Sequence, residues 1–184
     1  MQTFISLLRG INVSGQKKIR MADLKSLYEN LEFKEVSTYI QSGNVTFKSN
    51  EESPDLELAK KIEQAICQKY QFEVPVVVRN ANEWKNVISA NPFLKEKTID
   101  VEKLYVTFLS KIPGKAALQS IHQFDFSPDR FIIIEKEVFL YIPEGYGETK
   151  LSNKFFENKL KVTATTRNWK TINKLFEIVT GDHF

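Results

Sequence analysis

One stretch organises this chain: Leu8-Arg9-Gly10-Ile11-Asn12-Val13-Ser14-Gly15-Gln16-Lys17-Lys18-Ile19-Arg20. It follows an apolar segment, 3–9, that is typical of a β-strand, and it precedes a segment, 21–31, whose apolar residues recur at helical spacing. The stretch holds two glycines and four cations but no acid. Because glycine lets successive backbone N–H groups converge on one point, we expect a loop that can hold an anion between a strand and a helix.

The first part of the chain has the pattern of a βαββαβ unit. Strands are predicted over 3–9, 36–41, 45–48 and 74–79, and helices over 21–31 and 53–70. Ser42-Gly43-Asn44 is a hairpin signal, and Ser53-Pro54 supplies an N-cap and a first-turn proline to the second helix. This order of elements is that of ferredoxin-like domains.

The pattern restarts after a linking helix predicted over 82–90. Strands are predicted over 103–109, 131–135, 138–142 and 161–165, and helices over 115–122, 152–160 and the C-terminal segment from Trp169. We therefore predict an α+β fold of duplicated ferredoxin-like type, with two βαββαβ units and antiparallel sheets. Their boundaries are predicted at 1–80 and 101–184, with the linking helix and a loop over 81–100 and a terminal helix in the second unit.

The first strand of each predicted unit is apolar on both faces. Phe4 and Leu8 alternate with Ile5 and Leu7, and strand 103–109 shows the same property. A lone ferredoxin-like sheet has helices on one face and solvent on the other, which predicts alternation instead. We therefore expect the second face to be covered, either by the other unit or by a second copy in a homodimer.

Composition limits the class of protein. The 184 residues suit one large domain or two small ones, and no run of about 18 apolar residues exists to cross a bilayer. Without a signal-peptide pattern at Met1, we expect a cytoplasmic location and no membrane partner. The single Cys67 excludes an internal disulfide and a multi-thiolate metal cluster.

Charge is unevenly distributed along the chain. Residues 1–20 carry +4, residues 150–174 carry seven cations against Glu157, and the formal total is only +3. Such asymmetry favours an anionic partner, although a solvated surface gives the same pattern.

Topology is expected to bring the polar motifs together. Strands one and two of a βαββαβ unit run in the same direction, so loop 9–18 and hairpin 41–44 should be neighbours. In the second unit, loop 143–150 and the turn Thr165-Thr166-Arg167-Asn168 should likewise share one end, so that each unit has a polar, basic end. We expect the two threonines at the N-terminus of the last helix, whose N–H groups favour an anion. The candidate ligand-binding residues are Arg9, Gly10, Asn12, Ser14, Gly15, Lys17, Gln41, Ser42, Asn44, Lys150, Thr166, Arg167 and Asn168.

The same residues have a structural interpretation as helix caps and turn stabilisers, and both interpretations stay open. Gly10-x4-Gly15-Gln16-Lys17 differs from a P-loop because its lysine comes one residue late and no Ser or Thr follows. His122 and His183 have no sequence neighbours that suggest a triad or a zinc site, and Trp84 and Trp169 fall on apolar helix faces. We predict no catalytic residue, metal or cofactor, and a binding protein rather than an enzyme.

Three ordered motifs, Leu7–Val13, Thr38–Val45 and Thr165–Trp169, resemble the bacterial domain of unknown function family 1697. The resemblance spans nearly the whole chain, and the family often has two glycines where this chain has Ser14-Gly15. It implies a duplicated ferredoxin-like α+β fold and no established activity.

Three functions are compatible with the sequence. The leading hypothesis is a binding module for a small anionic ligand, a phosphate or a carboxylate, held at the Gly10–Gly15 backbone. The second is a structural or interaction scaffold that forms a homodimer. The third, RNA or single-stranded DNA binding, would use Phe4 and Phe47 in strands one and three, but it is less favoured because no RNP1-like pattern is present.

Overall fold

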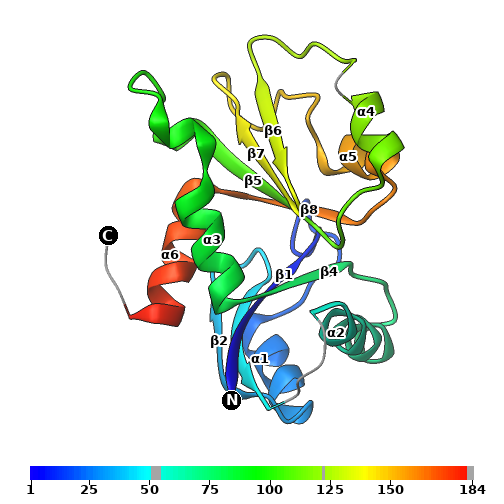
Figure 1. Cartoon of the computed structure of the whole chain (residues 1–184). Helices are drawn as coiled ribbons and strands as arrows, with labels where there is room; N and C mark the ends of the chain where they lie inside the picture. Colours follow the sequence, from blue (N-terminus) through cyan, green and yellow to red (C-terminus); the bar gives the residue numbers. More distant parts are fainter. Residues whose placement is uncertain (51–54, 122, 182–184) are drawn as a thin grey trace. The chain divides into compact units, whose positions relative to one another are not determined.

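The computed structural model describes residues 1–50, 55–121 and 123–181 (Figure 1). They form two compact units: Met1–Lys85 together with the C-terminal residues from Lys174 onward, and Asn86–Asn173. The Ser53-Pro54 cap, His122 and His183 lie outside the described residues. No helix among the described residues is long and apolar enough to span a membrane.

The first unit contains a four-stranded antiparallel sheet. Its strands are β1 (Gln2–Leu8), β2 (Lys34–Tyr39), β3 (Asn44–Ser49) and β4 (Val76–Asn80), in the spatial order β2-β3-β1-β4. Helices α1 (Met21–Asn30) and α2 (Asp55–Tyr70) complete the βαββαβ order and pack on one face of the sheet. The predicted ferredoxin-like arrangement is confirmed here.

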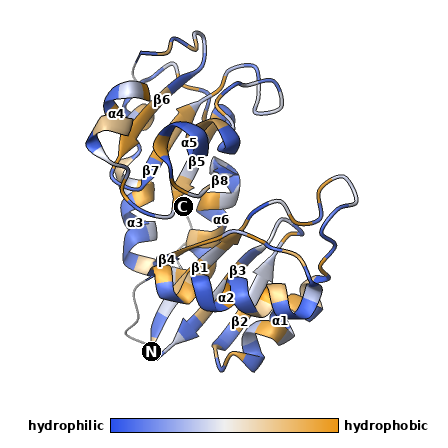
Figure 2. Cartoon of the chain, turned by 90° about the vertical axis from the view of Figure 1, so that its right-hand side faces the viewer, coloured by the Kyte–Doolittle hydropathy of each residue, from blue (hydrophilic) through white to orange (hydrophobic). Residues whose placement is uncertain are grey.

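A core of aromatic and aliphatic side chains joins this sheet to its two helices. The rings of Phe4 and Phe47 lie with centroids 5.6 Å apart, and Tyr28 of α1 contacts Phe47 edge-on at 5.5 Å. In Figure 2, hydrophobic and hydrophilic residues alternate around α1 and α2, as expected for helices with one buried face. Phe4 and Phe47 are 2% and 1% exposed, so these rings do not form a surface on which bases could stack.

The second unit repeats the architecture. Its strands are β5 (Leu104–Leu109), β6 (Arg130–Ile134), β7 (Glu137–Tyr141) and β8 (Ala164–Asn168), in the order β6-β7-β5-β8. Helices α4 (Lys115–Ile121) and α5 (Asn153–Leu160) supply Ile121, Phe156 and Leu160 to its core. The remaining elements are α3 (Ala81–Ala90), the short 3-10 helices η1 (Pro92–Lys95) and η2 (Val101–Lys103), and α6 (Trp169–Thr180).

Equivalent residues of the two sheets pair in the same register. Ile5 of β1 pairs with Arg79 of β4, and Val106 of β5 pairs with Arg167 of β8. Each last strand then ends in the dipeptide Arg-Asn, and each asparagine caps the helix that follows. The Asn80 side chain accepts the Glu83 N–H at 2.9 Å, and the Asn168 side chain accepts the Thr171 N–H at 2.8 Å. The two units therefore correspond in the order of their elements and also at these single residues.

The second face of each first strand is buried, as predicted. Ile5 and Leu7 in β1 and Val106 and Phe108 in β5 have no measurable exposure. Trp84 and Trp169, which the sequence places on apolar helix faces, are buried as well.

One predicted element boundary is wrong in a way that affects the candidate site. Strand β8 runs to Asn168, so Thr165 and Thr166 lie inside a strand and not at the N-terminus of the last helix. The β-branched threonines pair with Phe108 and Thr107 of β5, which favours the extended conformation over a helical turn. The hairpin between β6 and β7 also turns over Glu135 and Lys136, one residue earlier than predicted.

Candidate functional site

The loop that joins β1 to α1, residues Arg9 to Arg20, is called the 9–20 loop below. At its tip the Gln16 N–H donates to the Val13 carbonyl at 2.9 Å. Ser14 and Gly15, the two central residues of this turn, have φ values of 49° and 75°. Positive φ at both central residues characterises a type I′ turn, which glycine adopts without steric cost. The loop is therefore a small hairpin rather than an open cradle of N–H groups.

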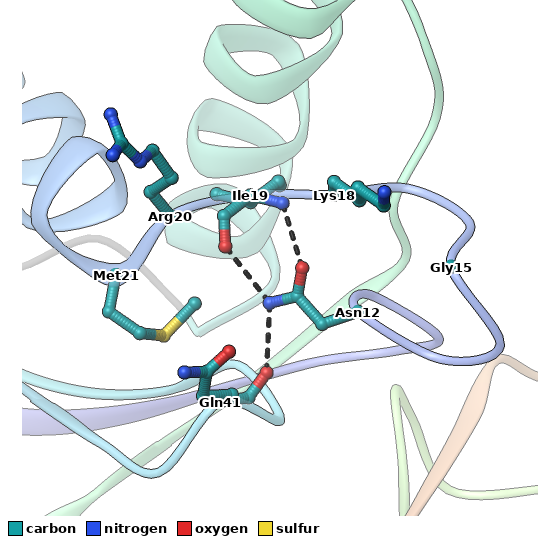
Figure 3. Close-up of a pocket in the computed structure, with 7 residues that line it drawn as sticks. All are labelled: Asn12, Gly15, Lys18, Ile19, Arg20, Met21 and Gln41. Atoms are coloured by element: carbon teal, nitrogen blue, oxygen red, sulfur yellow. Dashed lines mark hydrogen bonds between the residues drawn. The ribbon is translucent and has the colours of Figure 1, made fainter.

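Asn12 ties this hairpin to the turn between β2 and β3. Its Nδ2 donates to the carbonyl oxygens of Ile19 at 2.9 Å and Gln41 at 3.0 Å, while its Oδ1 accepts the Ile19 N–H at 2.9 Å (Figure 3). The prediction that the loop after strand one and the hairpin after strand two are neighbours is confirmed by these contacts. Both amide hydrogens of Asn12 are used, so its side chain acts on the loop and has no donor left for a ligand.

Gly43 lets the two loops approach each other. It is buried with φ 77°, and a Cβ built on it would lie 2.6 Å from the Cβ of Leu8 and 3.0 Å from the Cδ1 of Ile11. The neighbouring Asn44 donates from Nδ2 to the Tyr39 carbonyl at 3.1 Å and to the Ser42 Oγ at 3.0 Å. Ser42 and Asn44 therefore stabilise the β2–β3 turn, which contacts the 9–20 loop.

Two of the predicted ligand cations are engaged inside the chain. Lys17 donates from Nζ to the Glu73 carbonyl at 2.6 Å, which ties the 9–20 loop to the segment before β4. Arg9 is half-buried, its N–H donates to the Pro75 carbonyl at 2.9 Å, and it has further interactions within the chain. Both residues therefore tie the 9–20 loop to the segment that precedes β4.

A pocket of about 480 Å³ opens between the 9–20 loop and the β2–β3 turn (Figure 3). It is lined by Asn12, Gly15, Lys18, Ile19, Arg20, Met21 and Gln41. Lys18 and Arg20 are exposed, and neither side chain has a hydrogen bond or an ion pair with another described residue. No acid lines the pocket among the described residues, so its charge is positive.

The N-terminus of α1 also contributes positive character, and Asp23 is the one acid in its first turn. Arg20 occupies the N-cap position with φ −72° and ψ 137°, and its side chain makes no capping hydrogen bond. The first turn of a helix carries N–H groups without intrahelical partners and the positive end of the helix dipole. Because Met21, the first residue of α1, lines the pocket, these groups lie at its edge.

Residues of the second unit meet as predicted, but their polar atoms are already paired. The Tyr146 hydroxyl, from loop 143–150, donates to the Thr166 Oγ1 at 3.0 Å. The same oxygen lies 2.7 Å from the Oγ1 of Thr107 and donates to the Asn153 Oδ1 at 2.7 Å. A hydroxyl has one hydrogen and two lone pairs, so Thr166 has no capacity left for a ligand.

The other candidates of the second unit have separate roles. Arg167 donates from Nη1 to the Thr165 Oγ1 at 3.0 Å and to the Thr166 carbonyl at 2.9 Å. Burial lowers the pKa of the Arg167 guanidinium to about 10, so the group stays charged at neutral pH. Asn168 caps α6. These contacts support the structural interpretation of the Thr165–Asn168 motif.

Lys150 lines a pocket of about 250 Å³ together with four acidic residues, Asp125, Asp129, Glu144 and Glu148. The expectation of a basic end in the second unit is wrong at this place. Two of these acids, Asp125 and Asp129, come from the loop between α4 and β6. No sequence pattern indicated that this loop and Lys150 line the same pocket. Four acids against one lysine give the lining of this pocket a negative formal charge, which disfavours an anion there.

The sequence interpretation did not select Lys18 and Arg20, although a signal for them exists. The two cations flank Ile19, which is 3% exposed, in the extended segment before α1. Alternation of polar and apolar residues in an extended segment places the outer two on the same, exposed side. Cys67 is exposed, and no group of three or more His, Cys, Asp or Glu among the described residues is placed to hold a metal ion.

Comparison with known proteins identifies the family but no activity. A solved structure, "The structure of conserved bacterial protein SP0830 from Streptococcus pneumoniae", matches with a TM-score of 0.73 and 21% sequence identity, over 97% of this chain and 99% of that chain. No curated protein matches. Residues 1–139 match the family described as "Protein of unknown function (DUF1697)". The chain therefore belongs to the DUF1697 family of proteins of unknown function.

Proposed function

We propose that the pocket beside the 9–20 loop binds a small anionic ligand that carries a phosphate or a carboxylate. The observation that carries this proposal is the pair of cations, Lys18 and Arg20, which line the pocket without partners among the described residues. Side chains of this kind attract anions, and an arginine donates two parallel hydrogen bonds to a phosphate or carboxylate. The uncapped first turn of α1 supplies further donors at the same edge.

The dimensions of the pocket favour a metabolite over a macromolecule. Its volume of about 480 Å³ lies within the range of small-molecule sites. Ile19 and Met21 add an apolar wall beside the two cations. We therefore expect a ligand with one anionic group and an apolar or ring-shaped part.

The loop contacts support affinity by keeping the site in one conformation. Asn12 and Lys17 hold the loop to residues far away in the sequence, Gln41 and Glu73. A site that is ordered before binding loses less conformational entropy when the ligand arrives. In this proposal Asn12 and Lys17 are positioning residues, and Lys18 and Arg20 contact the ligand.

The magnitude of the effect follows from the chemistry of the contacts. A hydrogen bond to a charged group contributes about 1.5–3 kcal/mol. Since about 1.4 kcal/mol corresponds to a tenfold change in Kd, removing either cation should weaken binding by roughly 10- to 150-fold. Binding should also weaken as salt is raised, because both side chains are exposed.

The test is a thermal-shift and calorimetric screen of the full chain. The probes are inorganic phosphate, nucleoside monophosphates, sugar phosphates and dicarboxylates, each with wild type and with the double variant Lys18→Ala/Arg20→Ala. A ligand at about 100 times its Kd stabilises the folded state by about 2.7 kcal/mol, which a melting curve resolves. We expect a shift with wild type that the double variant loses.

A matched control separates the site from net charge. The double variant Lys34→Ala/Lys97→Ala removes two exposed lysines that do not line this pocket. It should keep the wild-type response to the probe. An equal loss in both double variants, or a response in neither protein to any probe, contradicts the proposal.

A further inference from the structure

Strand β6 is an edge strand without the usual protection of an edge. Among the described strands it pairs only with β7, in an uninterrupted register from Arg130 to Ile134. An edge strand directs the N–H and C=O groups of alternate residues away from its sheet, where they can pair with another chain. The corresponding strand of the first unit, β2, is interrupted by a register shift after Lys34, and Glu35 has φ 49°. Bulges of this kind block strand addition, and β6 has none.

The side chains of β6 favour an added strand. Its sequence is Arg130-Phe131-Ile132-Ile133-Ile134, and Ile132 and Ile134 are each 39% exposed. β-branched and aromatic residues stabilise cross-strand pairs. The exposed side chains of Ile132 and Ile134 would therefore lose accessible apolar area when a strand joins this edge.

A groove lies beside the first residues of β6. It has a volume of about 320 Å³, and its apolar lining comes from Phe93, Phe124, Phe126, Phe131 and Ile132. Main-chain hydrogen bonds give strand addition its affinity, and pockets for alternate side chains give it selectivity. The groove can accept an apolar or aromatic side chain of an added strand.

Acidic residues lie at both ends of β6, and Lys159 contacts the groove, with its Nζ 4.3 Å from the ring centroid of Phe124. Arg130 donates to the two carboxylate oxygens of Glu96 at 3.2 and 3.0 Å, and its guanidinium lies 5.1 Å from the ring centroids of Phe93 and Tyr141. The positive charge of Arg130 is therefore already balanced by Glu96. Asp125 and Asp129 line the groove at one end of the strand, and exposed Glu135 follows the other end.

We propose that β6 binds an extended segment of another protein as an added strand, with apolar residues alternating along it and a lysine or arginine near each end. The apolar residues would cover Ile132 and Ile134, and the basic ends would face Asp125 and Asp129 on one side and Glu135 on the other. This interaction surface is separate from the proposed anion site.

A second copy of this chain is a poorer occupant. Antiparallel pairing of two β6 strands about Ile132 places Asp129 of each strand opposite Glu135 of the other. Like charges directly opposite each other destabilise a strand pair. The acidic ends of β6 therefore select a basic partner over self-association.

The experiment uses the full chain and three capped octapeptides with an alternating valine and threonine core. The first carries a lysine at each end, the second carries glutamates instead, and the third is the lysine peptide with alternate backbone nitrogens methylated. Fluorescence anisotropy should show that the lysine peptide binds at least tenfold more tightly than either counterpart. Hydrogen exchange of wild type should slow in β6 when the lysine peptide is added.

Two protein variants localise the binding. Ile132→Lys should reduce the affinity for the lysine peptide at least tenfold, while Ile112→Lys, at a residue 59% exposed and outside β6, should leave it within twofold. The methylated peptide tests wild type directly, so the result does not depend on the folding of a variant. Equal binding of the lysine and methylated peptides, or no binding of the lysine peptide, would overturn the proposal. A wild-type dimer in sedimentation that Ile132→Lys dissociates would also overturn it, in favour of a second copy.

Discussion

Replacing Gly43 with alanine should destabilise the first unit more than the same substitution at Gly10 or Gly15. The new Cβ would lie 2.6 Å from the Cβ of Leu8 and 3.0 Å from the Cδ1 of Ile11, so backbone or core must move. Overpacking of this kind costs about 1–3 kcal/mol, and a φ of 77° adds about 1–2 kcal/mol for a residue with a side chain. The expected total is about 2–5 kcal/mol. Urea unfolding followed by circular dichroism measures it.

Gly15→Ala is the matched control for Gly43→Ala. Gly15 has φ 75°, nearly the same value, but no atom lies within 4 Å of its added Cβ. Its substitution should cost only the conformational part, about 1–2 kcal/mol. If the two variants lose equal stability, the close approach of Gly43 to Leu8 and Ile11 contributes nothing and the reasoning is refuted.

Three further predictions concern single polar groups. Asn12→Asp removes both amide donors and should cost about 1–3 kcal/mol in urea unfolding; an unchanged midpoint would contradict the role of Asn12. Burial raises the pKa of Tyr28, whose hydroxyl lies 2.8 Å from the Ser6 Oγ, so stability should fall as pH rises above about 10, and Tyr28→Phe should reduce that loss. Desolvation raises the pKa of Glu63, so Glu63→Gln should gain stability relative to wild type as pH rises above about 4.5, and a parallel pH profile of the two proteins would refute this.

Much of the fold was predictable because its signals are local. Hydrophobic periodicity and the hairpin signal at Ser42-Gly43-Asn44 identified both βαββαβ units and the proximity of two loops distant in sequence. The start of β2 was missed because the register shift after Lys34 breaks the alternation of its side chains. The extent of β8 was missed because Asn168 both ends a strand and caps a helix, so one residue serves two elements.

The candidate site shows the boundary between sequence and tertiary structure most clearly. The sequence by itself determined that a glycine-containing, basic loop follows the first strand and meets the hairpin after the second, because strand direction follows from the order of elements. Only the tertiary structure decided which cations remain without partners. Lys17 reaches the Glu73 carbonyl, 56 residues away, whereas Lys18 and Arg20 line the pocket unpaired among the described residues. Hydrogen bonds between distant segments depend on distances of about 3 Å, and no local pattern of residue types encodes those distances.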